Sequence, residues 1–168
     1  MNPLLELVVR GTLLGVGGAV LMDAWALLLR RGFGIRGLDY ALLGRWVGHL
    51  PRGRVSHASI AAAAPVRGER TLGWTAHYAI AVGFAMLLLV LAGPTWSAAP
   101  TLIAPMLVAL GTIAAPWFVM QPAMGLGIAA SRSPRPGAAR LRNVANHLVY
   151  GVGVYAAALI VATIWPRT

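Results

Sequence analysis

The sequence predicts an all-α protein: a four-transmembrane-helix bundle with a cytoplasmic amphipathic helical segment between spans 1 and 2. Three observations predict this fold class. Of the 168 residues, 58% are hydrophobic and only 11% are charged, and the apolar residues fall into four long runs. Soluble domains are about one quarter charged, so this composition is typical of a membrane protein instead. We expect a single membrane domain over residues 1–168.

The four apolar runs have the length of membrane spans. A helix needs about 20 apolar residues to cross about 30 Å of hydrocarbon. The runs predict spans over about residues 8–29, 74–93, 101–121 and 144–165. The third run continues to about Ala130 and contains Pro105, Pro116 and Pro122. A re-entrant segment after Pro122 is therefore an open alternative for this run.

The first run allows two interpretations. Ala24-Trp25-Ala26 resembles the cleavage site of a signal peptide, but the apolar residues continue to Leu29, which favours a span. Gly11, Gly15 and Ala19 follow one another at steps of four. Small residues at this spacing allow close helix contact, either within the chain or in a homo-oligomer.

The arginines set the expected orientation. Segment 30–73 carries eight arginines and segment 131–143 carries four, whereas the link 94–100 carries none. Because basic residues stay cytoplasmic near membrane spans, segments 30–73 and 131–143 are predicted to be cytoplasmic and both termini outside. The arginines lie between apolar runs, so we expect anionic lipid headgroups as their partner and no nucleic acid. The predicted headgroup contacts are Arg30, Arg31, Arg45, Arg140 and Arg142.

The first cytoplasmic segment contains an amphipathic stretch over residues 38–50. Its apolar residues recur at helical spacing, at Leu38, Leu42, Leu43, Trp46 and Leu50. Arg45 and His49 lie four residues apart beside this stripe. A basic helix with a tryptophan fits the membrane surface, and a helix packed on the end of the bundle fits equally well.

Polar residues of different spans are expected at a similar depth near the cytoplasmic face. Ionisable groups inside apolar runs are costly, so each needs a reason. The predicted polar site contains Asp23, His77, His147, Gln121, Glu69 and His57. The sequence has no Cys, which excludes a Cys-based metal site, but two imidazoles and a carboxylate suit a divalent metal or an iron cofactor. His77, His147 and Asp23 are the predicted metal ligands.

Two other uses of the same residues stay open. In a structural or assembly protein they would only hold helices together through hydrogen bonds and ion pairs. In a small ion or proton transporter, Asp and His would relay charge. No nucleophilic serine with a base at helical spacing is visible, so the sequence leaves open whether the protein is an enzyme.

Six blocks of the sequence carry a resemblance to a known family, namely residues 22–25, 38–40, 44–46, 73–78, 121–131 and 146–151. Together they resemble a family of small bacterial membrane proteins, the domain of unknown function 2938 (DUF2938). The resemblance covers nearly the whole chain. It implies a four-helix, multi-pass protein of the bacterial inner (plasma) membrane. It implies no activity and assigns no catalytic or binding residue.

Overall fold

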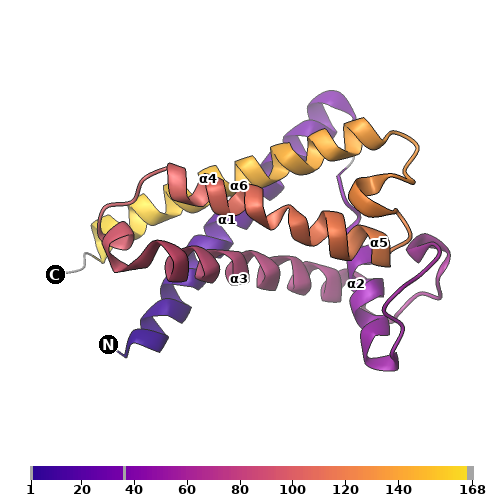
Figure 1. The fold of residues 1–168 in the computed structure, drawn as a ribbon, viewed down its shortest axis with the longest axis horizontal. Helices are drawn as coiled ribbons and strands as arrows, with labels where there is room; N and C mark the ends of the chain where they lie inside the picture. The colour runs from indigo at the N-terminus through magenta and orange to yellow at the C-terminus, as the bar shows by residue number, and fades with distance from the viewer. Residues whose placement is uncertain (1, 36, 166–168) are drawn as a thin grey trace. The chain divides into compact units, whose positions relative to one another are not determined.

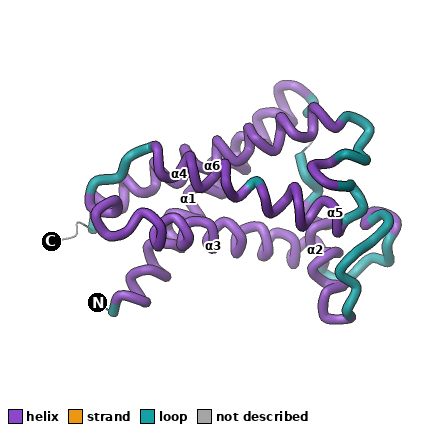
Figure 2. The backbone as a smooth tube through the Cα atoms, in the orientation of Figure 1, coloured by secondary structure: helices purple, strands orange, loops and turns teal. Residues whose placement is uncertain are grey.

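A computed structural model describes residues 2–35 and 37–165. These residues form helices joined by turns, and no strand occurs among them (Figures 1 and 2). The α-helices are α1 (Pro3–Phe33), α2 (Tyr40–His49), α3 (Glu69–Ala98), α4 (Ile103–Thr112), α5 (Gln121–Ala123) and α6 (Pro136–Ile164). Short 3-10 helices are η1 (Leu50–Arg52), η2 (Ile60–Ala62) and η4 (Ile128–Ala130), and η3 (Ala115–Met120) is a π-helix. The predicted all-α fold is confirmed.

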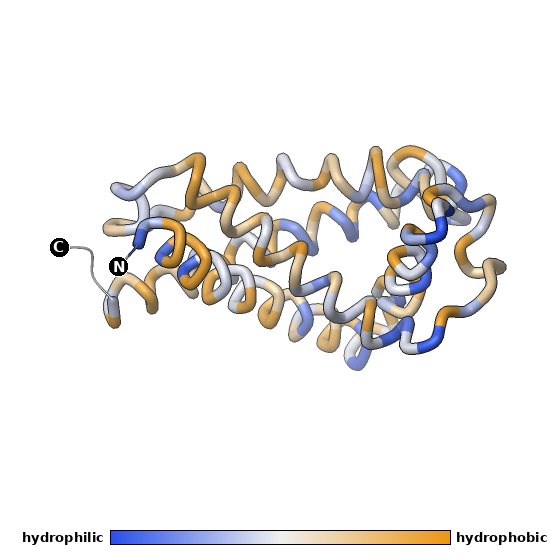
Figure 3. The backbone as a smooth tube through the Cα atoms, turned by 90° about the horizontal axis from the view of Figure 1, so that it is seen from below, coloured by the Kyte–Doolittle hydropathy of each residue, from blue (hydrophilic) through white to orange (hydrophobic). Residues whose placement is uncertain are grey.

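Four helical stretches are long and apolar enough to cross a membrane, and apolar positions recur along them (Figure 3). Their bounds are Pro3–Phe33, Glu69–Ala98, Ile103–Ala123 and Pro136–Ile164. Each has a mean hydropathy between 1.8 and 2.0 over its most apolar window. They overlap the four predicted spans, and the protein is a multi-pass membrane protein.

The sequence at the two ends of α1 explains its bounds. The Asn2 side chain accepts a hydrogen bond from the Leu4 amide at 2.9 Å, which satisfies one of the free N–H groups of the first turn. Pro3 follows at the first helical position, where a missing N–H costs nothing. Gly34 ends the helix in the left-handed conformation, with φ at 67°. The Ile35 amide then bonds back to the Leu29 carbonyl at 3.1 Å.

Glycine and proline interrupt the second and third spans. Gly93 has φ 74° and ψ −177° immediately before Pro94, so α3 breaks where the predicted second span ends. In the third span Pro116 lies in the π-helix, and the helix continues through α5. After Ala123 the chain turns, with Gly125, Gly127, Ala129 and Ala130 at positive φ.

The chain folds into two compact units, which are described separately. Unit 1 comprises residues 1–36, 78–112 and 145–168, and unit 2 comprises residues 37–77 and 113–144. One boundary falls inside α3 and another inside α6 before its buried residues, so these two long helices contribute to both units. The single domain over 1–168 stays a prediction.

Unit 1 is an apolar helix assembly whose backbones approach closely. A Cβ added to Gly15 of α1 would lie 2.5 Å from the Cα of Val82 on α3, and one added to Gly153 of α6 would lie 2.9 Å from the Cα of Gly18. The stripe of small residues that could have served a homo-oligomer therefore packs within the chain. The buried core is formed by Leu14, Ala19, Ala81, Ala85, Leu88, Leu89, Trp96, Ala109, Tyr150, Val154, Ala158 and Val161.

Unit 2 joins α2 to the start of α3 and to the segment around α5. Gly44 of α2 lies against the Glu69 carbonyl, and Gly73 of α3 lies against the Tyr40 carbonyl, so the two helices cross without room for a side chain. The helix predicted over residues 38–50 is confirmed as α2, and Asp39 caps it by accepting from the Ala41 amide at 2.9 Å.

Candidate functional site

Asp23 of α1 is bonded to α3 within unit 1. The Tyr78 hydroxyl donates to Asp23 Oδ2 at 3.0 Å, and Asp23 is half-buried. This contact directs the Asp23 carboxylate towards α3. A hydroxyl donor stabilises a carboxylate in an apolar setting, and here it also links two helices.

His147 of α6 contacts α4, also within unit 1. Its Nδ1 lies 2.9 Å from the Ala109 carbonyl oxygen and 3.3 Å from Thr112 Oγ1. A carbonyl can only accept, so Nδ1 carries the proton and Nε2 is the basic nitrogen of the neutral ring. Thr112 Oγ1 also donates to the Ala109 carbonyl, at 2.9 Å. His147 thus fills a local hydrogen-bonding position between two helices.

His77 lies in unit 2 and packs among aromatic rings. It is 7% exposed, and its Nε2 is 3.3 Å from the Tyr40 hydroxyl. The ring stacks on Tyr40 with centroids 4.4 Å apart, and the Trp74 ring meets its edge at 5.8 Å. These contacts fix α2 on the first turns of α3.

Gln121 belongs to a polar group at the junction of η3 and α5 in unit 2. Its Nε2 donates to Asn143 Oδ1 at 2.7 Å, and Trp117 Nε1 donates to the same oxygen at 3.3 Å. Gln121 is 5% exposed. Its Oε1 is buried and finds no hydrogen-bond partner in the described part of the chain.

Glu69 forms a two-pronged ion pair with Arg45. Arg45 Nε and Nη2 donate to the two Glu69 carboxylate oxygens, each at 2.8 Å. Glu69 lies before the apolar part of α3, and hydrogen bonds from Arg45 and from the Val66 amide lower its pKa to about 2. The same hydrogen bond raises the pKa of Arg45. Both groups therefore stay charged over the physiological range.

The remaining nitrogen of Arg45 binds the loop before α3. Nη1 donates to three carbonyl oxygens at 3.0–3.3 Å, those of Ile60, Ala61 and Ala63. All three guanidinium nitrogens are thus occupied inside unit 2. The structure gives the Arg45 guanidinium a carboxylate and three carbonyls as partners, and the headgroup contact of Arg45 stays a prediction.

His57 pairs with a residue that was not among the predicted site residues. Its Nε2 lies 2.8 Å from Nδ1 of His49, which is 4% exposed. The two rings stack with centroids 4.9 Å apart. The sequence offered one indication that His49 belongs with the polar residues of unit 2. It lies four residues after Arg45, which places both side chains on one face of α2.

The predicted site residues are divided between the two units and have separate partners. Asp23 and His147 belong to unit 1, and His77, Gln121, Glu69 and His57 belong to unit 2. Across residues 2–35 and 37–165 no group of three His, Cys, Asp or Glu residues is arranged to hold a metal ion. The metal site of His77, His147 and Asp23 stays a prediction.

A buried arginine in unit 1 was not predicted. Arg10 is 2% exposed; its Nε donates to Glu6 Oε1 at 2.8 Å and its Nη2 to the Trp165 carbonyl at 2.9 Å. The guanidinium also lies 5.1 Å from the centre of the Trp165 ring. Glu6 and Arg10 are four residues apart, a spacing that brings helical side chains together.

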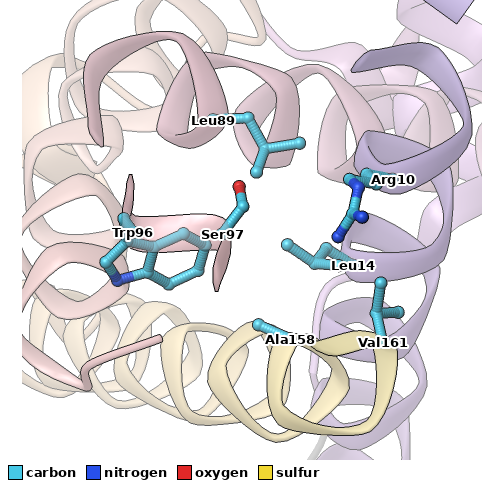
Figure 4. Close-up of a pocket in the computed structure, with 7 residues that line it drawn as sticks. All are labelled: Arg10, Leu14, Leu89, Trp96, Ser97, Ala158 and Val161. Carbon is cyan, nitrogen blue, oxygen red and sulfur yellow. The ribbon is translucent and has the colours of Figure 1, made fainter. Parts of the chain in front are cut away.

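Arg10 borders a small pocket in unit 1 (Figure 4). The pocket is lined by Arg10, Leu14, Leu89, Trp96, Ser97, Ala158 and Val161. Its walls are mostly apolar, and the Trp96 indole nitrogen is bonded to the Thr101 carbonyl at 3.1 Å. The guanidinium is already bonded to Glu6 and Trp165, so the pocket is part of the helix packing.

The family assignment rests on a match over most of the chain. The model of the family described as "Protein of unknown function (DUF2938)" matches residues 12–161. The chain belongs to this family. The resemblance found in the sequence is thus confirmed, and the matched DUF2938 region includes all the predicted site residues. No curated protein and no solved structure matches the chain.

Proposed function

We propose that this DUF2938 protein lies in the bacterial inner membrane with both termini outside, and that unit 2 binds anionic phospholipid headgroups at the cytoplasmic face. The distribution of charge supports this. Unit 2 contains nine arginines and two acidic residues. Because arginine-rich segments stay cytoplasmic, this composition favours the cytoplasmic side for the connecting segments of unit 2, residues 37–73 and 131–143.

The exposure of the unit 2 arginines carries the proposal. Seven of them are exposed, namely Arg52, Arg54, Arg67, Arg70, Arg132, Arg135 and Arg140. Of the two acids, Asp39 caps α2 and Glu69 is bonded to Arg45. The positive charge is therefore available to an external anion. Each arginine near an anionic membrane surface contributes about 1 kcal/mol of attraction.

The polar residues inside the apolar helices are proposed to hold the helices together. Asp23 accepts from Tyr78, and the Tyr150 hydroxyl donates to the Ala81 carbonyl at 2.6 Å. Each bond joins two different helices of unit 1. This supports a structural or assembly role for these residues.

Headgroup binding can be tested with purified protein in a neutral detergent. Phosphatidylglycerol should raise the unfolding temperature more than phosphatidylcholine does, because only the former carries net charge. Replacing Arg52, Arg54, Arg67 and Arg70 with Gln should sharply reduce that difference, and the matched replacement with Lys should keep most of it. Equal stabilisation by the two lipids, or full stabilisation of the Gln variant, would contradict the proposal.

The orientation has its own test, because the natural chain has no Cys. Single cysteines can be placed at two exposed residues, Thr95 in the link 94–100 and Ser131 in the segment 131–143. The first is proposed to lie outside and the second in the cytoplasm. In intact cells an impermeant maleimide should label Thr95→Cys and not Ser131→Cys. The reverse labelling would invert the proposed topology.

Metal binding and ion transport are the alternative functions from the sequence, and the contacts within each unit do not favour either. Metal analysis of the purified protein, with His77→Ala and His147→Ala as controls, tests the first. Ion flux in proteoliposomes, with Asp23→Asn as the control, tests the second. Stoichiometric metal lost in both His variants, or flux lost in Asp23→Asn, would replace the structural role proposed here.

A further inference from the structure

A short basic loop in unit 2 is closed at its base by two histidines. The loop comprises residues 50–56, and its Arg52 and Arg54 are exposed. The Trp46 indole nitrogen donates to the Val55 carbonyl at 2.8 Å, and the Arg54 amide bonds to the His49 carbonyl at 3.3 Å. His49 and His57 flank the loop and meet across its base.

The contact between the two imidazoles depends on a single proton. His49 Nδ1 and His57 Nε2 are 2.8 Å apart, so one nitrogen donates an N–H and the other accepts it. If both rings carry two protons, neither nitrogen can accept and two positive charges face each other. Two nitrogens alone do not complete a metal site, and no third ligand joins them among the described residues.

The second histidine also anchors the chain that follows the loop. The His57 amide donates to the Ala123 carbonyl at 2.8 Å, and the Ile60 amide donates to the Met124 carbonyl at 3.0 Å. Gly125 packs against the Ala58 carbonyl. Displacing His57 therefore disturbs the hydrogen bonds that dock this segment on the chain around α5.

The surrounding charges do not neutralise a second imidazolium. Glu69 of α3 interacts electrostatically with His49, but both of its oxygens are bonded to Arg45, one turn before His49 on α2. Arg52 and Arg54 in the loop add positive charge. The segment 121–125, which packs against His57, contains no titratable side chain. When both rings are protonated, two positive charges face each other and the fold loses this contact.

We propose that the His49–His57 pair is an acid-sensitive latch that holds the basic loop on unit 2 and releases it when both imidazoles are protonated. Histidine is the side chain that ordinarily changes charge between about pH 5 and 8. Release would loosen the loop that carries Arg52 and Arg54, which are exposed and available to headgroups also when the latch is closed. The link to headgroups rests on the proposed function, whereas the release itself does not.

Hydrogen exchange of the detergent-solubilised protein tests the latch without any lipid. Exchange is followed in peptides covering residues 53–62 at about pH 7.5 and about pH 5, after correction for the intrinsic exchange rate. We expect protection in this region to fall by about tenfold at the lower pH, as for a local opening that leaves the remaining fold intact. Peptides from residues 78–92 should keep their protection.

Three variants make the test specific. His49→Gln and His57→Gln retain hydrogen-bonding groups but cannot titrate, so the pH response should disappear in both. His147→Gln, in unit 1, should retain it. If a Gln variant does not fold, the wild-type protein alone still tests the latch. The test is then whether acid lowers the protection of residues 53–62 and leaves that of residues 78–92 unchanged.

Some results would overturn the latch. These are equal protection of residues 53–62 at the two pH values, loss of protection that extends equally to residues 78–92, or a pH response that persists in both Gln variants. Failure of headgroup binding is measured separately with phosphatidylglycerol at neutral pH. The two proposals can therefore fail independently.

Discussion

In both units glycines let helices approach closely, but in unit 2 a single charged side chain also joins several segments. Gly15 lets α1 approach the backbone of α3, and Gly153 lets α6 approach that of α1. In unit 2, Arg45 alone donates to Glu69 and to three carbonyls. Packing is indifferent to pH and salt, but ion pairs are not. The two units should therefore respond to different perturbations.

The largest expected effect concerns the ion pair of buried Arg10 with half-buried Glu6 in unit 1. Arg10→Met removes a donor from the Glu6 carboxylate and from the Trp165 carbonyl, so the free energy of unfolding should fall by about 3 kcal/mol. Denaturation in mixed micelles measures this. The double variant Glu6→Gln/Arg10→Met should recover part of the loss. No loss in Arg10→Met would mean that the pair is not part of the packing of unit 1.

The next effect tests the close helix contact directly. Gly15→Ala places a Cβ 2.5 Å from Val82 Cα, a backbone atom that cannot give way alone. We expect a loss of about 1–3 kcal/mol, as for overpacked cores. Gly83→Ala is the matched control, since a Cβ at Gly83 meets no atom within 4 Å. Equal stability of the two variants would remove the distinction between packed and open glycines.

The third prediction concerns the pH response of unit 2. The pKa of Glu69 is lowered from 4.5 to about 2, so the stabilisation by its carboxylate is complete above about pH 4.5 and is lost as the pH falls through about 2. Protection of the Val66 amide, which donates to Glu69 at 3.0 Å, should fall over this range.

Glu69→Gln separates this response from other effects of acid. The variant should have weaker protection at Val66 that does not change between about pH 4.5 and about pH 2, because its amide does not titrate there. Amides of α1 should show no matching transition. A transition of equal size in the variant would assign the pH response to another group.

The smallest effect concerns a neutral hydrogen bond in unit 1. Thr112→Val removes the bond to the Ala109 carbonyl and the contact with His147, and the expected cost is about 0.6 kcal/mol. Thr163→Val is the control, because Thr163 makes the same type of bond to Ile160 but is exposed. A cost well above that of the ion pair of Arg10 would reverse the expected ranking.

The long helices and α2 could be predicted because length and periodicity act locally. About 20 apolar residues define a span whatever its neighbours are. The Asp39 cap and the stripe from Leu42 to Trp46 likewise act within one helix. These features needed no knowledge of tertiary contacts.

The grouping of the polar residues could not be derived in the same way. Residues at a similar depth in the membrane need not be neighbours, because depth does not determine how each helix is rotated or which helix lies beside it. His147 bonds to a carbonyl of α4, and Gln121 bonds to Asn143. His49 and Arg10 were overlooked as site residues, although each lies four residues from a charged residue on its own helix. Their partners come from segments far along the chain, such as His57 and Trp165.

Ala129 and Ala130 adopt φ values of 48° and 57°, a region where a Cβ costs about 1–2 kcal/mol per residue. Arg140 Nε donates to the Ala129 carbonyl at 2.9 Å and so helps to keep the turn in this shape. Glycine would adopt the same turn without the steric penalty, but it would also widen the range of conformations open to the chain before folding. Alanine at these positions thus raises the steric energy of the folded turn, but it lowers the conformational entropy that the unfolded chain loses on folding.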